Sequence, residues 1–117
     1  MRSPRADRLL VEDMLESLGR IARYTEGMQI ETFLSDRKTI DAVVRNLEII
    51  GEAAARLTFD ARQRQPGTEW QQIIGLRNRI VHEYFGVDTE IVWQIISRDL
   101  PQLSEDLQRL LETLPGN

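Results

Sequence analysis

Residues 77 to 84, Arg-Asn-Arg-Ile-Val-His-Glu-Tyr, hold the side chains with the clearest capacity for chemistry. His82 is the only histidine of the chain, and histidine can accept and donate protons near neutral pH. Arg77 carries a planar fork of N–H donors that matches a phosphate group, and Asn78 is a neutral donor and acceptor. Tyr84 adds a phenol, which is a weak acid and a site for covalent modification. The segment is therefore a candidate for proton transfer at a phosphate.

The composition excludes several other kinds of site. The chain has no cysteine, so thiol catalysis, disulfides and cysteine-based zinc sites are ruled out. It has one histidine and no Asp/Glu group with the spacing of a metal-binding loop, so we expect no metal site and no cofactor. The net charge of −4 argues against a broad nucleic-acid-binding surface, but it is compatible with a small basic site that acts locally on RNA.

The length and the apolar content fit one ordinary globular domain. The chain has 117 residues, of which 41% are hydrophobic and 29% charged, so we expect a single domain over residues 1–117. No apolar run approaches the roughly 18 residues that a membrane span needs, and the N-terminus has no apolar signal region. We therefore expect a cytoplasmic protein with no membrane partner.

The apolar residues repeat with a helical period almost throughout, which predicts an all-α fold, an antiparallel bundle of four to five helices. Ser3 and Pro4 indicate a helix start, and Gly51 lies mid-stripe in the second long helix, where it would permit a close helix crossing. The other predicted boundaries are a helix over residues 36–59, a helix that Thr68 caps and Gly86 ends, a helix capped by Asp88, and a kink or split at Pro101.

The predicted third helix sets a geometric problem. At about 100° per residue, Arg77 lies about 20° from Trp70, in the middle of an apolar arc, so its charge must be paired or must face a cleft or a partner. His82 lies about 140° from Arg77 on the same wheel. The two side chains would converge either at the end of an irregular helix or across a two-fold axis, where two copies share one cleft. We favour the homodimer.

A purely structural interpretation stands beside the chemical one. A lone histidine near a helix end is commonly a surface residue, and Tyr84 would then belong to the core with its hydroxyl at the rim. Arg77 would be the ion-pair partner of Glu48 or Glu52. Arg45, Glu48 and Glu52 are secondary candidates for lining a cleft, although an ion-pair network is the commoner role for such residues.

The motif Arg77-x4-His82-x-Tyr84 resembles the R-x4-H-x-Y signature of HepT-like proteins, a branch of the HEPN superfamily. The similarity covers roughly Leu9 to Leu111. Further matching positions are Asn78 directly after the arginine, residues 45–53, Trp70, and residues 85–88.

This resemblance implies a HEPN-like fold, a two-fold homodimer and a metal-independent endoribonuclease that is the toxin of a toxin–antitoxin module. Arg77, Asn78 and His82 would be its catalytic residues, with His82 as acid or base and its symmetry mate in the other role. The implied antitoxin is a minimal nucleotidyltransferase, MntA-like, which transfers AMP to Tyr84. One alternative is a non-catalytic nucleotide-binding partner subunit of a minimal nucleotidyltransferase, and another is a plain dimeric helical scaffold.

Overall fold

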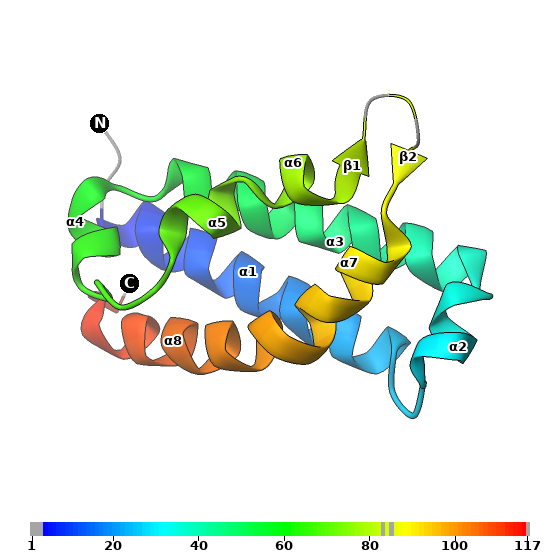
Figure 1. Cartoon of the computed structure of the whole chain (residues 1–117). Coiled ribbons are helices and arrows are strands. Elements are labelled where there is room, and N and C mark those ends of the chain that lie inside the picture. Colours follow the sequence, from blue (N-terminus) through cyan, green and yellow to red (C-terminus); the bar gives the residue numbers. More distant parts are fainter. Residues whose placement is uncertain (1–3, 83, 85, 117) are drawn as a thin grey trace.

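Three long helices form the body of the molecule in the computed structural model, which describes residues 4–82, 84 and 86–116. They are α1 (Pro4–Tyr24), α3 (Arg37–Arg56) and α8 (Leu100–Thr113) (Figure 1). Ser3, the predicted cap of the first helix, lies outside the described residues. The prediction of an all-α helical fold is confirmed, although the described residues form more and shorter helices than the four to five predicted.

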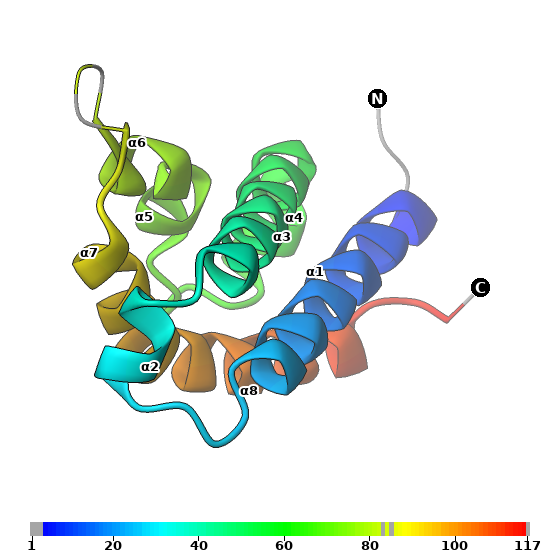
Figure 2. The ribbon, with the colours of Figure 1, turned by 90° about the vertical axis from the view of Figure 1, so that its right-hand side faces the viewer.

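Shorter elements connect the long helices and build one side of the domain. The short helices and the π-helical turn are α2 (Ile30–Leu34), α4 (Phe59–Gln63), α5 (Trp70–Ile74), α6 (Leu76–Ile80), α7 (Thr89–Gln94) and η1 (Ile95–Asp99). Two short antiparallel strands, β1 (Val81–His82) and β2 (Gly86–Val87), pair with His82 opposite Gly86. In Figures 1 and 2 this hairpin lies away from both chain termini.

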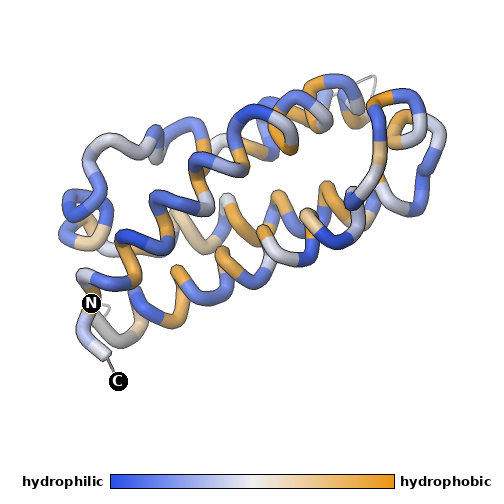
Figure 3. The backbone as a smooth tube through the Cα atoms, turned by 90° about the horizontal axis from the view of Figure 1, so that it is seen from below, coloured by the Kyte–Doolittle hydropathy of each residue, from blue (hydrophilic) through white to orange (hydrophobic). Residues whose placement is uncertain are grey.

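The core lies between α1, α3 and α8 and continues under the short helices. Figure 3 shows the hydrophobic positions of the long helices turned toward the space that they enclose. Met14, Leu47 and Leu107 are fully buried, one from each long helix. The apolar residues that repeat with a helical period along the first two long helices are buried at Met14, Leu18, Ile21, Ile40, Val43, Leu47, Ile50, Ala54 and Leu57.

Gly51 lets α5 approach α3 closely, as the sequence predicts. The glycine is buried, and a Cβ atom there would lie 3.1 Å from the backbone oxygen of Ile73 in α5. Such a contact is too short for most side chains, so the absence of a Cβ atom allows the two backbones to pack together. The consequence for the site is that α5, and α6 directly after it, are seated against α3.

The predicted single helix from Thr68 to Gly86 is wrong. The chain leaves the regular helix at Gly75, resumes as α6, and becomes extended at Val81, where φ is −109° and ψ is 122°. The carbonyl of Ile80 accepts a hydrogen bond from the N–H of Asp88 at 2.7 Å, so the returning strand replaces a further helical turn. Gly86 has a φ of 72°, which L side chains rarely adopt, and it belongs to this hairpin instead of ending a helix.

The predicted cap at Thr68 is also wrong, and the cap at Asp88 is confirmed. The Thr68 hydroxyl donates to the carboxylate of Asp106 at 2.9 Å, which ties the start of α5 to α8. Asp88 Oδ1 accepts from the N–H of Ile91 at 3.1 Å, satisfying a free donor at the start of α7. Asp36 caps α3 in the same way through the N–H of Thr39 at 3.0 Å.

One other predicted boundary needs correction, and one is confirmed. The helix that was predicted to reach Phe59 ends at Arg56, and Thr58 then caps the separate helix α4. The predicted split at Pro101 is confirmed, since α8 begins at Leu100 with Pro101 in its first turn, directly after the π-helical turn η1. The chain passes into α8 through η1, where the N–H of Leu100 donates to the carbonyl of Ile95, five residues back. Within the described ranges, no helix has the length and apolar character to cross a membrane.

Candidate active site

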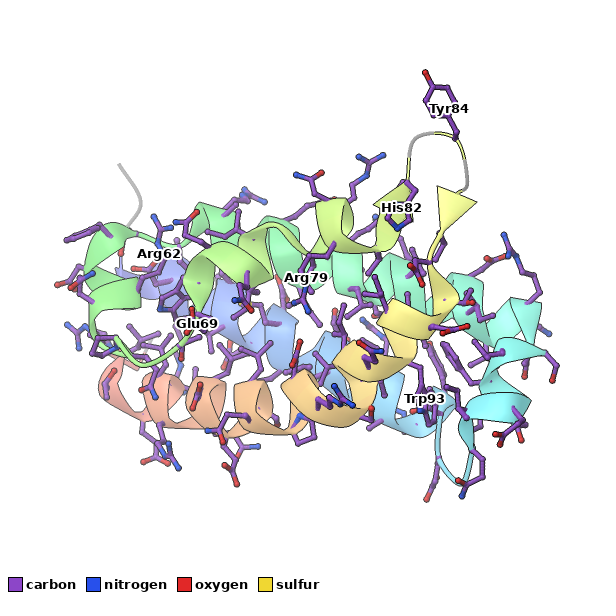
Figure 4. All side chains as sticks on the ribbon, in the orientation of Figure 1. Arg62, Glu69, Arg79, His82, Tyr84 and Trp93 are labelled. Atoms are coloured by element: carbon purple, nitrogen blue, oxygen red, sulfur yellow. The ribbon has the colours of Figure 1, made fainter. Side chains whose placement is uncertain are left out.

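The β1–β2 hairpin presents Tyr84 to solvent. Tyr84 lies in the turn between the strands and is 86% exposed. In Figure 4 its ring projects from the tip of the hairpin, away from the helices. The interpretation of Tyr84 as a core residue is therefore wrong. Its phenol stands where another macromolecule can reach it.

His82 lies in β1, at the base of the same hairpin, and faces Asp88. Its Nε2 atom is 3.4 Å from Asp88 Oδ2, and its side chain is 48% exposed. The backbone of His82 is held by the pairing with Gly86. The imidazole is thus partly open to solvent on one side and next to a carboxylate on the other.

Arg77 is exposed, so the prediction that it lies in the middle of an apolar face is wrong. The buried residues of α6 are Leu76 and Ile80, whereas the Arg77 side chain is 67% exposed. The break at Gly75 changes the rotation of α6 relative to α5, and the wheel drawn from Trp70 does not continue through it. Arg77 Nε lies 3.7 Å from Glu48 Oε2, which is the ion pair that the structural interpretation offered.

A small cavity of about 270 Å³ brings several of the predicted residues together. It opens between α3 and the α5–α6 segment. Its lining consists of Glu48, Gly51, Glu52, Ala55, Ile74, Arg77 and Asn78. Arg45 is exposed on α3 and does not line this cavity, and neither does His82. Arg77 therefore lines this cavity without His82.

Arg79 is the nearest cationic neighbour of Arg77 along the chain, and it serves a different surface. Its guanidinium donates to Asp99 Oδ2 at 3.2 Å, which links α6 to η1. Both residues line a separate cavity of about 200 Å³ between the α5–α6 segment and α8. The two arginines of the motif are thus directed to two different clefts.

The described part of the chain contains no group of three or more His, Cys, Asp or Glu side chains that could hold a metal ion. Acid–base work at this site would fall to His82, with Arg77 and Asn78 as donors to a phosphate. Sequence reasoning treated Asp88 only as a helix cap and missed its contact with His82. The signal that could have revealed it is Gly86, whose position between the two residues favours a tight reversal.

The domain is mostly helical and carries a candidate acid–base site for phosphate chemistry. The site is a short segment that exposes Arg77, Asn78, His82 and Tyr84. The chain belongs to the ribonuclease HepT-like family, whose model matches residues 14–110. It is 36% identical over 100 residues to "Probable ribonuclease HepT" of Thermococcus cleftensis, covering 86% of this chain and 91% of that protein.

Two further relatives extend over nearly the whole chain. "Putative RNase MJ0127" of Methanocaldococcus jannaschii is 34% identical over 114 residues, covering 97% of this chain and 94% of the relative. "Putative RNase TTE0752" of Caldanaerobacter subterraneus is 33% identical over 112 residues, covering 96% and 97%. No solved structure matches this chain significantly. The resemblance to HepT-like proteins that the motif suggested is thereby confirmed at the level of the family.

Proposed function

We propose that this protein is a metal-independent endoribonuclease in which His82 moves protons and Arg77 binds the scissile phosphate. One observation carries the proposal. The chain belongs to a ribonuclease family, and its Arg77 and His82 side chains are 67% and 48% exposed, so neither is buried in the core. An exposed guanidinium and an exposed imidazole supply charge stabilisation and proton transfer, which are the two functions that RNA cleavage without a metal requires.

The reaction balances with these groups alone. A neutral His82 takes the proton of the ribose 2′-hydroxyl, and the 2′-oxygen forms a bond to phosphorus. The bond between phosphorus and the 5′-oxygen breaks, and a protonated imidazole gives its proton to that oxygen. The products are a 2′,3′-cyclic phosphate and a 5′-hydroxyl. Arg77 would hold two phosphate oxygens and stabilise the charge that develops on them, and Asn78 would orient the same group.

The two proton transfers need a base and an acid, and the chain has one histidine to offer. The proposal therefore places the active cleft between two copies related by a two-fold axis. His82 of one copy acts as the base and His82 of the second copy acts as the acid. This arrangement also gives Arg77 a way to meet a histidine of the second copy, because His82 does not line the cavity at Arg77.

The proposal includes control through Tyr84. A cognate minimal nucleotidyltransferase of the MntA kind would act as antitoxin to this toxin. The tyrosine oxygen would attack the α-phosphorus of ATP, pyrophosphate would leave, and the phenolic proton would pass to solvent. The exposure of Tyr84 at the tip of the hairpin supports its accessibility to such an enzyme. A phosphodiester there would add bulk and negative charge close to where RNA phosphate binds.

The nuclease is tested by incubating the purified protein with RNA in the presence of a metal chelator. Cleavage that ends in cyclic phosphate, and that is lost in His82→Ala while the circular dichroism spectrum stays the same, is the expected result. Equimolar wild-type and His82→Ala chains, refolded together so that subunits mix, should keep roughly one quarter of the wild-type rate if both histidines are required. A mixture that keeps one half of the wild-type cleavage rate would contradict the shared cleft, and normal cleavage by His82→Ala would contradict the whole mechanism.

Modification is tested by intact mass after incubation with the neighbouring nucleotidyltransferase and ATP. The chain has two tyrosines, Tyr84 and Tyr24, so Tyr24→Phe is the matched control. We expect a gain of AMP in wild type and Tyr24→Phe, and none in Tyr84→Phe. If the partner binds without any mass gain and the chain does not cut RNA, a non-catalytic nucleotide-binding subunit is the better description.

A further inference from the structure

Asp88 is fixed in place by groups on both sides of the hairpin. Its backbone N–H donates to the carbonyl of Ile80 at the end of α6. Its Oδ1 atom accepts from the N–H of Ile91 in the first turn of α7. The second carboxylate oxygen, Oδ2, is left over, and it lies 3.4 Å from Nε2 of His82. The carboxylate is therefore held by two helices while it faces the imidazole.

The His82 side chain depends on this carboxylate for its orientation. The strand pairing of His82 with Gly86 fixes its backbone, but the imidazole is about half exposed. Within residues 4–82, 84 and 86–116, Asp88 is the one carboxylate that pairs with it.

A carboxylate beside one nitrogen of an imidazole selects the tautomer. A neutral imidazole carries one proton, and that proton resides on the nitrogen that faces an acceptor, which leaves the lone pair on the other nitrogen. We propose that Asp88 is a positioning residue that keeps the proton of neutral His82 on Nε2 and leaves Nδ1 as the atom that exchanges protons with RNA. This proposal rests on the proposed ribonuclease function, but its first test does not require activity.

The competing explanation is that Asp88 only caps α7. Asp88→Asn separates the two roles, because asparagine caps helices as well as aspartate does. With its amide oxygen bonded to the N–H of Ile91, the amide nitrogen would face His82 and donate to it. The proton of neutral His82 would then move to Nδ1, which is the wrong nitrogen for the proposed chemistry. Asp36→Asn is the matched control, since Asp36 makes the same capping bond at the start of α3 and pairs with no histidine among the described residues.

The experiment is a long-range proton–nitrogen NMR spectrum of uniformly ¹⁵N-labelled protein at a pH where imidazole is neutral. Because the chain has one histidine, the two ring nitrogens are observed without ambiguity. We expect the Nε2–H tautomer in wild type and in Asp36→Asn, and the Nδ1–H tautomer in Asp88→Asn. Asp88→Ser, which keeps a capping oxygen but offers no carboxylate, should give a mixture. The same tautomer population in all four proteins would overturn the proposal.

Cleavage of RNA provides the second measurement. Asp88→Asn should lower kcat by roughly 10²-fold, the lower end of what general acid–base catalysis contributes, with little change in KM. Asp36→Asn should cleave at the wild-type rate. If wild type itself does not cut RNA, the proposed function fails while the NMR result still decides whether Asp88 orients His82. A shifted tautomer with an unchanged kcat would overturn the assignment of Nδ1 as the reacting atom.

Discussion

Removal of the Arg77 guanidinium should separate activity from stability. Its ion pair with Glu48 spans 3.7 Å, and the Arg77 side chain is 67% exposed. Pairs of this kind contribute about 0–1 kcal/mol to stability, because water screens the charges and ordering two long side chains costs entropy. Arg77→Ala should therefore lower the free energy of unfolding by less than about 1 kcal/mol, which corresponds to a few degrees in the thermal midpoint.

The expected effect on cleavage is much larger. A single donor to the developing charge of a transition state is worth about 10²–10³ in kcat, or roughly 3–4 kcal/mol. Arg77→Ala should lose activity by that factor while it remains folded. Arg77→Lys keeps the charge but loses the two-pronged contact, so it should recover only part of the rate. The assay is single-turnover RNA cleavage in chelator, together with thermal denaturation followed by circular dichroism.

Arg79→Ala is the matched control for this experiment. Arg79 lies two positions along the same helix and makes its own surface ion pair, with Asp99 at 3.2 Å. Its loss should cost as little stability as the loss of Arg77, yet it should leave cleavage unchanged, because Arg79 lines a different cavity. Equal cleavage by Arg77→Ala and wild type would refute the role given to Arg77. A thermal midpoint lowered by tens of degrees would refute the description of its ion pair as a surface contact.

Two further predictions concern stability. Asp7 is 3% exposed, and its carboxylate accepts hydrogen bonds from the Thr58 N–H at 2.9 Å and the Thr58 hydroxyl at 2.7 Å. Asp7→Ala should lower the free energy of unfolding by about 3 kcal/mol, measured by denaturant titration. An unchanged denaturation midpoint would contradict this prediction. Hydrogen bonds from the Thr39 N–H and hydroxyl hold the pKa of Asp36 below its ordinary 3.8, so its stabilisation is present above pH 3.8 and is lost as the pH falls through the lowered value. The free energy of unfolding of wild type should exceed that of Asp36→Asn near neutral pH, and the two values should converge in acid. A difference in stability that does not change with pH would show that the charge of Asp36 is not responsible.

The long helices could be predicted because their signals are local. The apolar residues of α3 repeat every three to four positions, and Leu47, Ile50 and Ala54 among them are buried. A capping aspartate precedes both α3 and α7, at Asp36 and Asp88. Each of these features involves neighbours within one or two turns, so a single sequence displays them directly.

The hairpin could not be predicted because its residues also fit a helix. Leu76, Ile80 and Tyr84 are spaced four apart, which is the period of one helical face. What ends the helix is a hydrogen bond from Asp88 to Ile80 and the positive φ of Gly86. Both depend on where the returning chain lies, and periodicity carries no information about that.

The same error hid the partner of His82. On a continuous helix, residues six apart are about 240° apart around the axis, so Asp88 would point away from His82. In the hairpin the chain reverses between them, and the carboxylate comes to 3.4 Å from the ring. The identities of the site residues Arg77, Asn78 and Glu48 could be read from the sequence, but their grouping around one cavity depends on how α6 is rotated against α3.

The π-helical turn has a consequence for the lengths that this chain tolerates. Through η1, the buried positions pass from Ile95 to Leu100, a step of five residues, where a regular helix would take three or four. Deleting one residue from η1 would restore a regular helix but would rotate everything before it by about 100°. The segment that carries both His82 and Asp88 would then be turned relative to α8. A deletion in η1 should therefore be rejected, even though it would make the helix more regular.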